Sequence, residues 1–80
     1  MIAILYTKPD CHLCEAALDE LRRLQARYPH QLETVDITAD PLLMQRYAER
    51  VPVLEVGGAE YSAPLSRAML ERALRSASGG

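Results

Sequence analysis

The chain has 80 residues, which is room for one domain with one core. Nine basic and eleven acidic residues give a net charge of −2, and the arginines do not gather into the basic stripe of a nucleic-acid-binding protein. The apolar start, residues 1–5, is shorter than the ~7–15 apolar residues of a signal peptide and the ~20 of a membrane-spanning helix. We therefore expect a cytoplasmic protein, monomeric, with no nucleic-acid or membrane partner.

The first half of the chain predicts a strand, a helix and a second strand. Residues 2–6 form a short β-prone run that a turn signal ends. Between residues 14 and 28, apolar residues recur at helical spacing and charged residues occupy the other face, until Pro29 stops the helix. Residues 32–37 then alternate well enough for a strand.

A second, shorter helix is expected over residues 41–49. Asp40 is a good N-cap, and proline at position 41 suits the first helical residue. The spacing of the apolar residues assigns the inner face of this helix to Leu42, Leu43, Met44 and Tyr47.

The second half of the chain ends in a hairpin and a helix. Residues 53–56 and 59–62 are expected to pair as antiparallel strands, because Gly57-Gly58 between them is a two-residue turn signal. Pro64 then opens the last helix, and the small polar residues 77–80 form a flexible tail.

The order β-α-β-α-β-β-α predicts the architecture. A strand, a helix and a strand in succession require a parallel pair with a right-handed crossover, and the hairpin adds an antiparallel edge. We therefore predict an α/β fold in which one mixed four-stranded sheet is flanked by three helices, within a single domain spanning residues 1–76.

The only two cysteines, Cys11 and Cys14, lie where the first strand gives way to the first helix. Thiols at this spacing can form, lose and re-form an intramolecular disulfide, and a helix N-terminus stabilises the reactive thiolate. We expect Cys11, nearer the solvent, to be the nucleophile, and Cys14, one turn inside, to resolve the mixed disulfide. In the cytoplasm such a pair is more often catalytic than structural.

Charged neighbours are expected to tune this pair. Lys8, the only lysine, either favours the thiolate and contributes to substrate binding or is a solvated loop charge, and the sequence leaves both open. Asp10 opposes the thiolate. His12 either adjusts the redox potential or is merely exposed, and the sequence leaves both open. We expect no metal, because His12 and His30 lie too far apart along the chain to complete a closed zinc site with the thiols, although a site shared by two chains stays open.

A Cys-x-x-Cys pair at the end of the first strand of a βαβ unit is typical of the thioredoxin fold. From Ile2 to about Arg75 the chain resembles the glutaredoxin-like branch of that fold. The features that carry the resemblance are Lys8 three residues before the first cysteine, the Cys11–Cys14 pair, the strand end Val35–Ile37, and Val51-Pro52 ahead of the hairpin.

The resemblance implies that the Val51–Pro52 peptide bond is cis and lies beside the cysteines. Such a turn would leave the backbone N–H and C=O of Val51 available to an extended substrate, and we expect Tyr6 to line the same groove. The alternative, from the residues alone, is a trans proline that starts an edge strand.

Glutathione binding in this family uses a Gly-Gly pair and a following acidic residue after the hairpin. The corresponding stretch here, Tyr61 to Ser66, has no glycine and no aspartate, so the usual glutathione-binding motif is absent. We expect no bound cofactor, and glutathione stays open as a co-substrate.

The sequence therefore predicts a small dithiol thiol–disulfide oxidoreductase. It would cycle Cys11–Cys14 between dithiol and disulfide while reducing disulfides in proteins or small molecules, and a reducing thiol system would regenerate it. The alternative is a non-catalytic thioredoxin-fold module that binds a partner protein or senses redox state.

Overall fold

The computed structural model describes residues 1–79 and contains one four-stranded sheet. β1 lies in the middle, parallel to β2 and antiparallel to β3, and β4 pairs antiparallel with β3 at the edge. The mixed sheet expected from the order of elements is therefore confirmed. Its strands are β1 (Ile2–Thr7), β2 (Gln31–Asp36), β3 (Val53–Val56) and β4 (Ala59–Ser62).

Three α-helices and one short 3₁₀ helix connect and flank the strands. They are α1 (His12–Leu24), η1 (Ile37–Ala39), α2 (Pro41–Tyr47) and α3 (Arg67–Ala77). The 3₁₀ helix is an element that the sequence did not predict. Within residues 1–79, none of the helices has the length and apolar character needed to cross a membrane.

Three helix boundaries differ from the predicted ones. α2 ends at Tyr47 rather than at residue 49. α1 ends at Leu24 rather than at residue 28, because the next residues turn back and donate two backbone N–H groups to the Leu24 carbonyl. α3 begins after Ser66 and not at Pro64, since the Ser66 hydroxyl caps the helix by accepting the Met69 N–H at 3.1 Å. α3 runs on through Ala77, and Gly80, the end of the predicted tail, lies outside the described residues.

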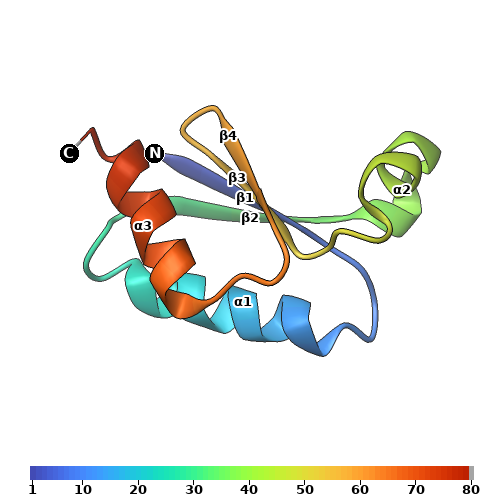
Figure 1. The fold of residues 1–80 in the computed structure, drawn as a ribbon, viewed down its shortest axis with the longest axis horizontal. Coiled ribbons are helices and arrows are strands. Elements are labelled where there is room, and N and C mark those ends of the chain that lie inside the picture. The colour runs from blue at the N-terminus through green and yellow to red at the C-terminus, as the bar shows by residue number, and fades with distance from the viewer. Residues whose placement is uncertain (80) are drawn as a thin grey trace.

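The main core lies between one face of the sheet and helices α1 and α3, which both cover that face (Figure 1). The alternation along β1 puts Ala3 and Leu5 into this core, where both are fully buried. Helical spacing adds Ala17 and Leu21 from α1, and α3 contributes three buried residues in the same way. The members of the cluster are Ala3, Leu5, Ala17, Leu21, Leu24, Leu54, Val56, Leu70, Ala73 and Leu74.

A second, smaller cluster of buried side chains lies at the end of β1 where the cysteines are. Its members, which we call the distal cluster, are Cys14, Ile37, Tyr47, Val51 and Val53. α2 contributes to it mainly through Tyr47, which is 1 % exposed, while Leu43 packs against the cluster from outside.

The predicted inner face of α2 is therefore wrong in part. Leu42 is 74 % exposed and Met44 is 38 % exposed. The physical reason is that α2 buries the face that carries Leu43 and Tyr47, which lie four residues apart, while Leu42 and Met44 lie to either side of that face.

The hairpin between β3 and β4 turns at Gly57 and Gly58, whose φ angles of 60° and 79° suit a mirror-image turn. A Cβ added at Gly57 would lie 2.8 Å from the Cβ of Ala77. Glycine at this position therefore also lets the last turn of α3 pack against the hairpin.

Candidate redox site

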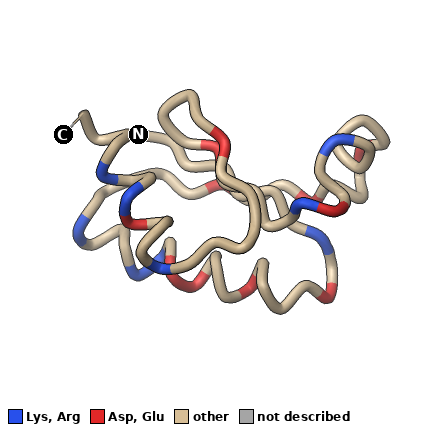
Figure 2. Tube along the Cα trace, in the orientation of Figure 1, with Lys and Arg blue, Asp and Glu red and all other residues tan. Residues whose placement is uncertain are grey.

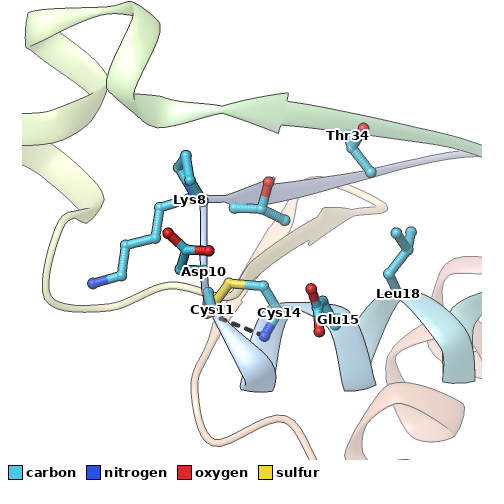
Figure 3. A pocket seen from close by; sticks show the side chains of 9 residues that line it. Lys8, Asp10, Cys11, Cys14, Glu15, Leu18 and Thr34 are labelled. Atoms are coloured by element: carbon cyan, nitrogen blue, oxygen red, sulfur yellow. Dashed lines mark hydrogen bonds between the residues drawn. A yellow bond between two sulfur atoms is a disulfide. The ribbon is translucent and has the colours of Figure 1, made fainter.

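The cysteines lie in the short loop and first turn that connect β1 to α1. The chain reverses at Asp10, whose φ of 57° lies in the left-handed region that aspartate tolerates better than most residues. Cys11 is the N-cap of α1, and its sulfur accepts a hydrogen bond from the Cys14 backbone N–H at 3.2 Å (Figure 3). A thiolate at this position would face an unpaired helix N-terminus, which favours negative charge.

The two cysteines are joined in a disulfide, with their Cα atoms 5.2 Å apart. They differ in exposure. Cys14 is 3 % exposed and belongs to the distal cluster, whereas Cys11 is half-buried and only packs against it. A reactant approaching from solvent therefore meets the sulfur of Cys11 first.

An open cavity of about 200 Å³ lies beside the disulfide, between the β1–α1 loop and β2 (Figure 3). Both cysteines form part of its wall, together with Lys8 and Asp10. Within residues 1–79, Lys8 makes no ion pair, and its side chain extends away from the disulfide in Figure 3. The cavity lining comprises Thr7, Lys8, Pro9, Asp10, Cys11, Cys14, Glu15, Leu18 and Thr34.

Five of these lining residues were not predicted as site residues from the sequence, namely Thr7, Pro9, Glu15, Leu18 and Thr34. Thr34 is paired with Leu5 in the sheet and therefore faces α1, as the alternation of β2 could have indicated once the register was known. Glu15 and Leu18 follow Cys14 by one and four residues, so helical spacing places Leu18 below Cys14 on the same side of α1.

Val51 and Pro52 lie on the other side of the disulfide. Their peptide bond is cis, Val51 is 8 % exposed, and Val51 packs with Cys14 in the distal cluster. One expectation about this turn is wrong. The Val51 N–H is not available to a substrate, because α2 ends in a turn that has it donating to the Tyr47 carbonyl at 3.1 Å. The Val51 carbonyl accepts no backbone hydrogen bond among the turn and loop contacts of residues 1–79.

Tyr6 lies on the sheet face that bears α2. Its ring stacks on the ring of Tyr47 with centroids 4.5 Å apart, and its hydroxyl donates to Glu55 at 3.2 Å. Burial and the Glu55 carboxylate raise the pKa of Tyr6. Tyr6 and Cys11 thus pack against the same cluster, while the Tyr6 hydroxyl is directed to the sheet.

A polar network holds Tyr47 in place beneath this site. Burial and the hydrogen bond that Tyr47 donates to Glu60 raise the pKa of Tyr47 to about 12. That hydrogen bond, with help from Arg46 and Arg50, lowers the pKa of Glu60. Both guanidinium groups also lie over the Tyr47 ring, 5.3 and 5.5 Å from its centroid. Tyr47, which packs with Cys14 in the distal cluster, is therefore held in place by one hydrogen bond and two cation–π contacts.

His12 points away from this arrangement. Its side chain is fully exposed and its Nδ1 lies 3.9 Å from the Glu15 carboxylate. Across residues 1–79 the structure brings together no group of three or more His, Cys, Asp or Glu side chains that could hold a metal ion. His30, the other histidine, has its Nδ1 2.6 Å from the Tyr28 carbonyl, at the far end of α1.

Comparison with solved structures finds the same fold elsewhere. The structural genomics target protein XcR50 from X. campestris shares 37 % sequence identity, with a TM-score of 0.78 over 94 % of this chain and 97 % of that one. A structure described as a malarial protein is 19 % identical with a TM-score of 0.68, over 95 % and 94 % of the two chains, which shows a similar fold only.

None of the curated proteins compared with the chain matches it. The family comparison is decisive instead. The model of the glutaredoxin-like domain (DUF836) matches residues 3–75, which is most of the chain and includes both cysteines and the Val51–Pro52 turn. With its thioredoxin-like topology and its cysteine pair at bonding distance, the chain belongs to the glutaredoxin-like domain family.

Proposed function

We propose that this protein is a thiol–disulfide oxidoreductase that reduces disulfides in proteins or small molecules through Cys11 and Cys14. The observation that carries the proposal is the placement of the Cys11 sulfur. Cys11 is half-buried at the N-cap of α1 and borders an open cavity, and its sulfur accepts the Cys14 N–H and is bonded to Cys14. That combination gives a stabilised thiolate, a partner thiol within reach and access for a substrate.

The reaction has two exchange steps. The Cys11 thiolate attacks one sulfur of the substrate disulfide, which forms a mixed disulfide and releases the other substrate sulfur as a thiolate. Cys14 then loses its proton and attacks the Cys11 sulfur, which closes the Cys11–Cys14 disulfide and releases the second substrate thiolate. Two electrons pass to the substrate, and an external dithiol or two monothiols return the protein to its reduced form.

The substrate would lie between the cavity and the Val51–Pro52 turn. Of the two backbone groups of Val51, only the carbonyl can serve, so a substrate amide N–H would donate to it. Lys8 and Asp10 would meet the substrate from the cavity side, since both line the cavity with Cys11. Tyr6 would not contact the substrate directly, and it would instead support the site by packing against the distal cluster.

We infer no resident cofactor, and the electrons would come from a thiol reductant in a reducing compartment such as the cytoplasm. Whether glutathione is that reductant has to be tested directly, because the stretch before α3 lacks the glycines and the acidic residue of the glutathione-binding motif. Titration of the ¹⁵N-labelled oxidised protein with oxidised and reduced glutathione would show binding as shifts of amide signals near Ser66 and Val51.

The proposal is tested by measuring two quantities, the catalytic turnover of a disulfide substrate and the reduction potential of the Cys11–Cys14 pair. The reduced protein should reduce insulin disulfides catalytically in the presence of a reductant, and the Cys11–Cys14 couple should have a potential of roughly −180 to −270 mV, the range of cellular thiol buffers. The variant Cys11→Ser should lose turnover, while Asp19→Asn, a change on the solvent side of α1, should keep it. A pair that exchanges with no thiol at a useful rate would instead favour a non-catalytic binding or sensing module.

A further inference from the structure

One face of the sheet is largely bare. α1 and α3 both cover the opposite face, and α2 reaches only the end of the sheet near the cysteines (Figure 1). Along β1, alternate side chains leave the core and point to this bare face, where Ile2 is 52 % exposed and Ile4 is half-buried. From β2, Val35 lies on the same face beside Tyr6.

The bare face is acidic as well as apolar. The strands contain no lysine or arginine, and three of their four acidic residues, Glu33, Glu55 and Glu60, lie on this face. Figure 2 shows that the basic positions lie on the helices and loops instead. The register aligns Ile4 with Glu33 of β2 on one side and Glu55 of β3 on the other. Glu55 in turn pairs with Glu60 of β4. Across the sheet, this row of side chains is therefore acidic on β2, apolar on β1, and acidic on both β3 and β4.

Like charges directly opposite each other on neighbouring strands are destabilising. The protein relieves this repulsion at Glu60 alone, which forms ion pairs with Arg46 and Arg50. Within residues 1–79, Glu33 and Glu55 form no ion pair with any basic side chain, and Glu55 only accepts the hydrogen bond from Tyr6. Two uncompensated carboxylates thus flank an exposed apolar strip.

We propose that this face, made of Ile2, Ile4, Val35, Glu33 and Glu55, binds an amphipathic helix of a partner protein whose apolar stripe is flanked by lysine or arginine. Adjacent strands are about 4.8 Å apart, so Glu33 and Glu55 lie about 10 Å apart across β1, close to the diameter of an α-helix. A helix laid along β1 would put its apolar residues on Ile2 and Ile4 and its basic residues beside the two carboxylates.

The charge pattern also selects against other occupants. A second copy of this face would bring carboxylates against carboxylates, and an anionic membrane surface would be repelled for the same reason. The proposal is separate from the redox chemistry, because the face is reached without touching the cavity or the Cys11 sulfur.

The test uses an 18-residue peptide of leucine and lysine in a helical amphipathic pattern, with one tryptophan as reporter. The chain itself has no tryptophan, so fluorescence of the peptide reports binding directly. A matched peptide with glutamate in place of lysine is the control for apolar binding. We expect the lysine peptide alone to bind, and amide shifts in the ¹⁵N-labelled protein to cluster on β1, β2 and β3.

Variants then test the two carboxylates. The double variant Glu33→Gln and Glu55→Gln keeps the shape of both side chains and an acceptor for Tyr6, and should weaken binding by about 2- to 30-fold, the sum of two exposed charge contacts. The control variant Asp19→Asn and Glu20→Gln removes the same charge from α1, on the opposite side of the sheet, and should bind as the native chain does.

Four results would overturn the proposal. The first is equal loss of affinity in the two double variants, which would indicate attraction to net charge only. The second is a set of amide shifts centred on Cys11 and the cavity in place of the sheet. The third is the absence of binding at millimolar peptide, and the fourth is self-association of the free protein through this face on dilution analysis.

Discussion

Replacing Cys14 by serine should trap the substrate that Cys11 attacks. In the native chain, a thiol on the same helix resolves the mixed disulfide, and the Cα atoms of the two residues are 5.2 Å apart. In the variant only a thiol from solution can do so, and the mixed disulfide therefore persists for longer.

The size of the effect follows from how closely the two residues are held. One thiol confined to a sphere of radius 5.2 Å has an effective concentration of about 3 M, which is far below the values reached by well-oriented intramolecular reactions and is thus a lower bound. An external thiol at ~5 mM is on the order of 500-fold more dilute, so the adduct should survive on the order of 500-fold longer.

The assay follows an aromatic disulfide that releases a coloured thiolate. The reduced native protein should release two equivalents in one burst, and Cys14→Ser should release one and retain the other as an adduct visible by intact mass. Cys11→Ser is the matched control and should react slowly, because Cys14 is only 3 % exposed. Adduct lifetimes within tenfold of each other in the native and Cys14→Ser proteins, or rapid labelling of Cys11→Ser, would refute the assigned roles.

Three further predictions concern stability and tuning. Tyr47→Phe should destabilise the protein at neutral pH. Its deficit in chemical denaturation should shrink as pH falls from 4.5, the ordinary value for glutamate, through the lowered pKa of Glu60, and as pH rises from 10 to about 12, where Tyr47 ionises; a deficit constant from pH 3 to 11 would contradict this. Ser66→Ala should lower the free energy of unfolding by about 1 kcal/mol and the melting temperature by roughly 4–8 °C, since α3 loses its N-cap; an unchanged melting curve would show that the cap contributes nothing. His12→Ala should move the Cys11–Cys14 potential by no more than about 10 mV in redox titration, because the imidazole is fully exposed; a shift of ~30 mV or more would mean that His12 tunes the pair.

Local patterns in the sequence were enough to place the sheet and the cysteines. The bounds of β3 and β4 agree with prediction because Gly57-Gly58 marks the turn on both sides. The position of Cys11 at the start of α1 follows from the change of period, from alternation in residues 2–6 to helical spacing after residue 14. These signals depend only on neighbours along the chain.

Features that depend on contacts distant in sequence could not be predicted in this way. The exposure of Leu42 reflects how little of α2 meets the sheet, which the spacing of apolar residues in α2 does not encode. The hydrogen bond from the Val51 N–H to the Tyr47 carbonyl is local, but it depends on where α2 ends, and helix ends are the least determined part of a sequence pattern. The acidic row through Glu33, Ile4 and Glu55 exists only in the register of three strands.

The separation of the distal cluster from the main core has a consequence for how this protein can evolve. α1 is the shared support, with Cys14 in one cluster and Ala17 and Leu21 in the other. Effects of substitutions at distant sites without common partners are close to additive. Substitutions of the leucines between the sheet and α3 should therefore change the free energy of unfolding without changing the reactivity of the cysteines. Substitutions near Ile37 and Val53 should change the reactivity of the cysteines and affect the main core less.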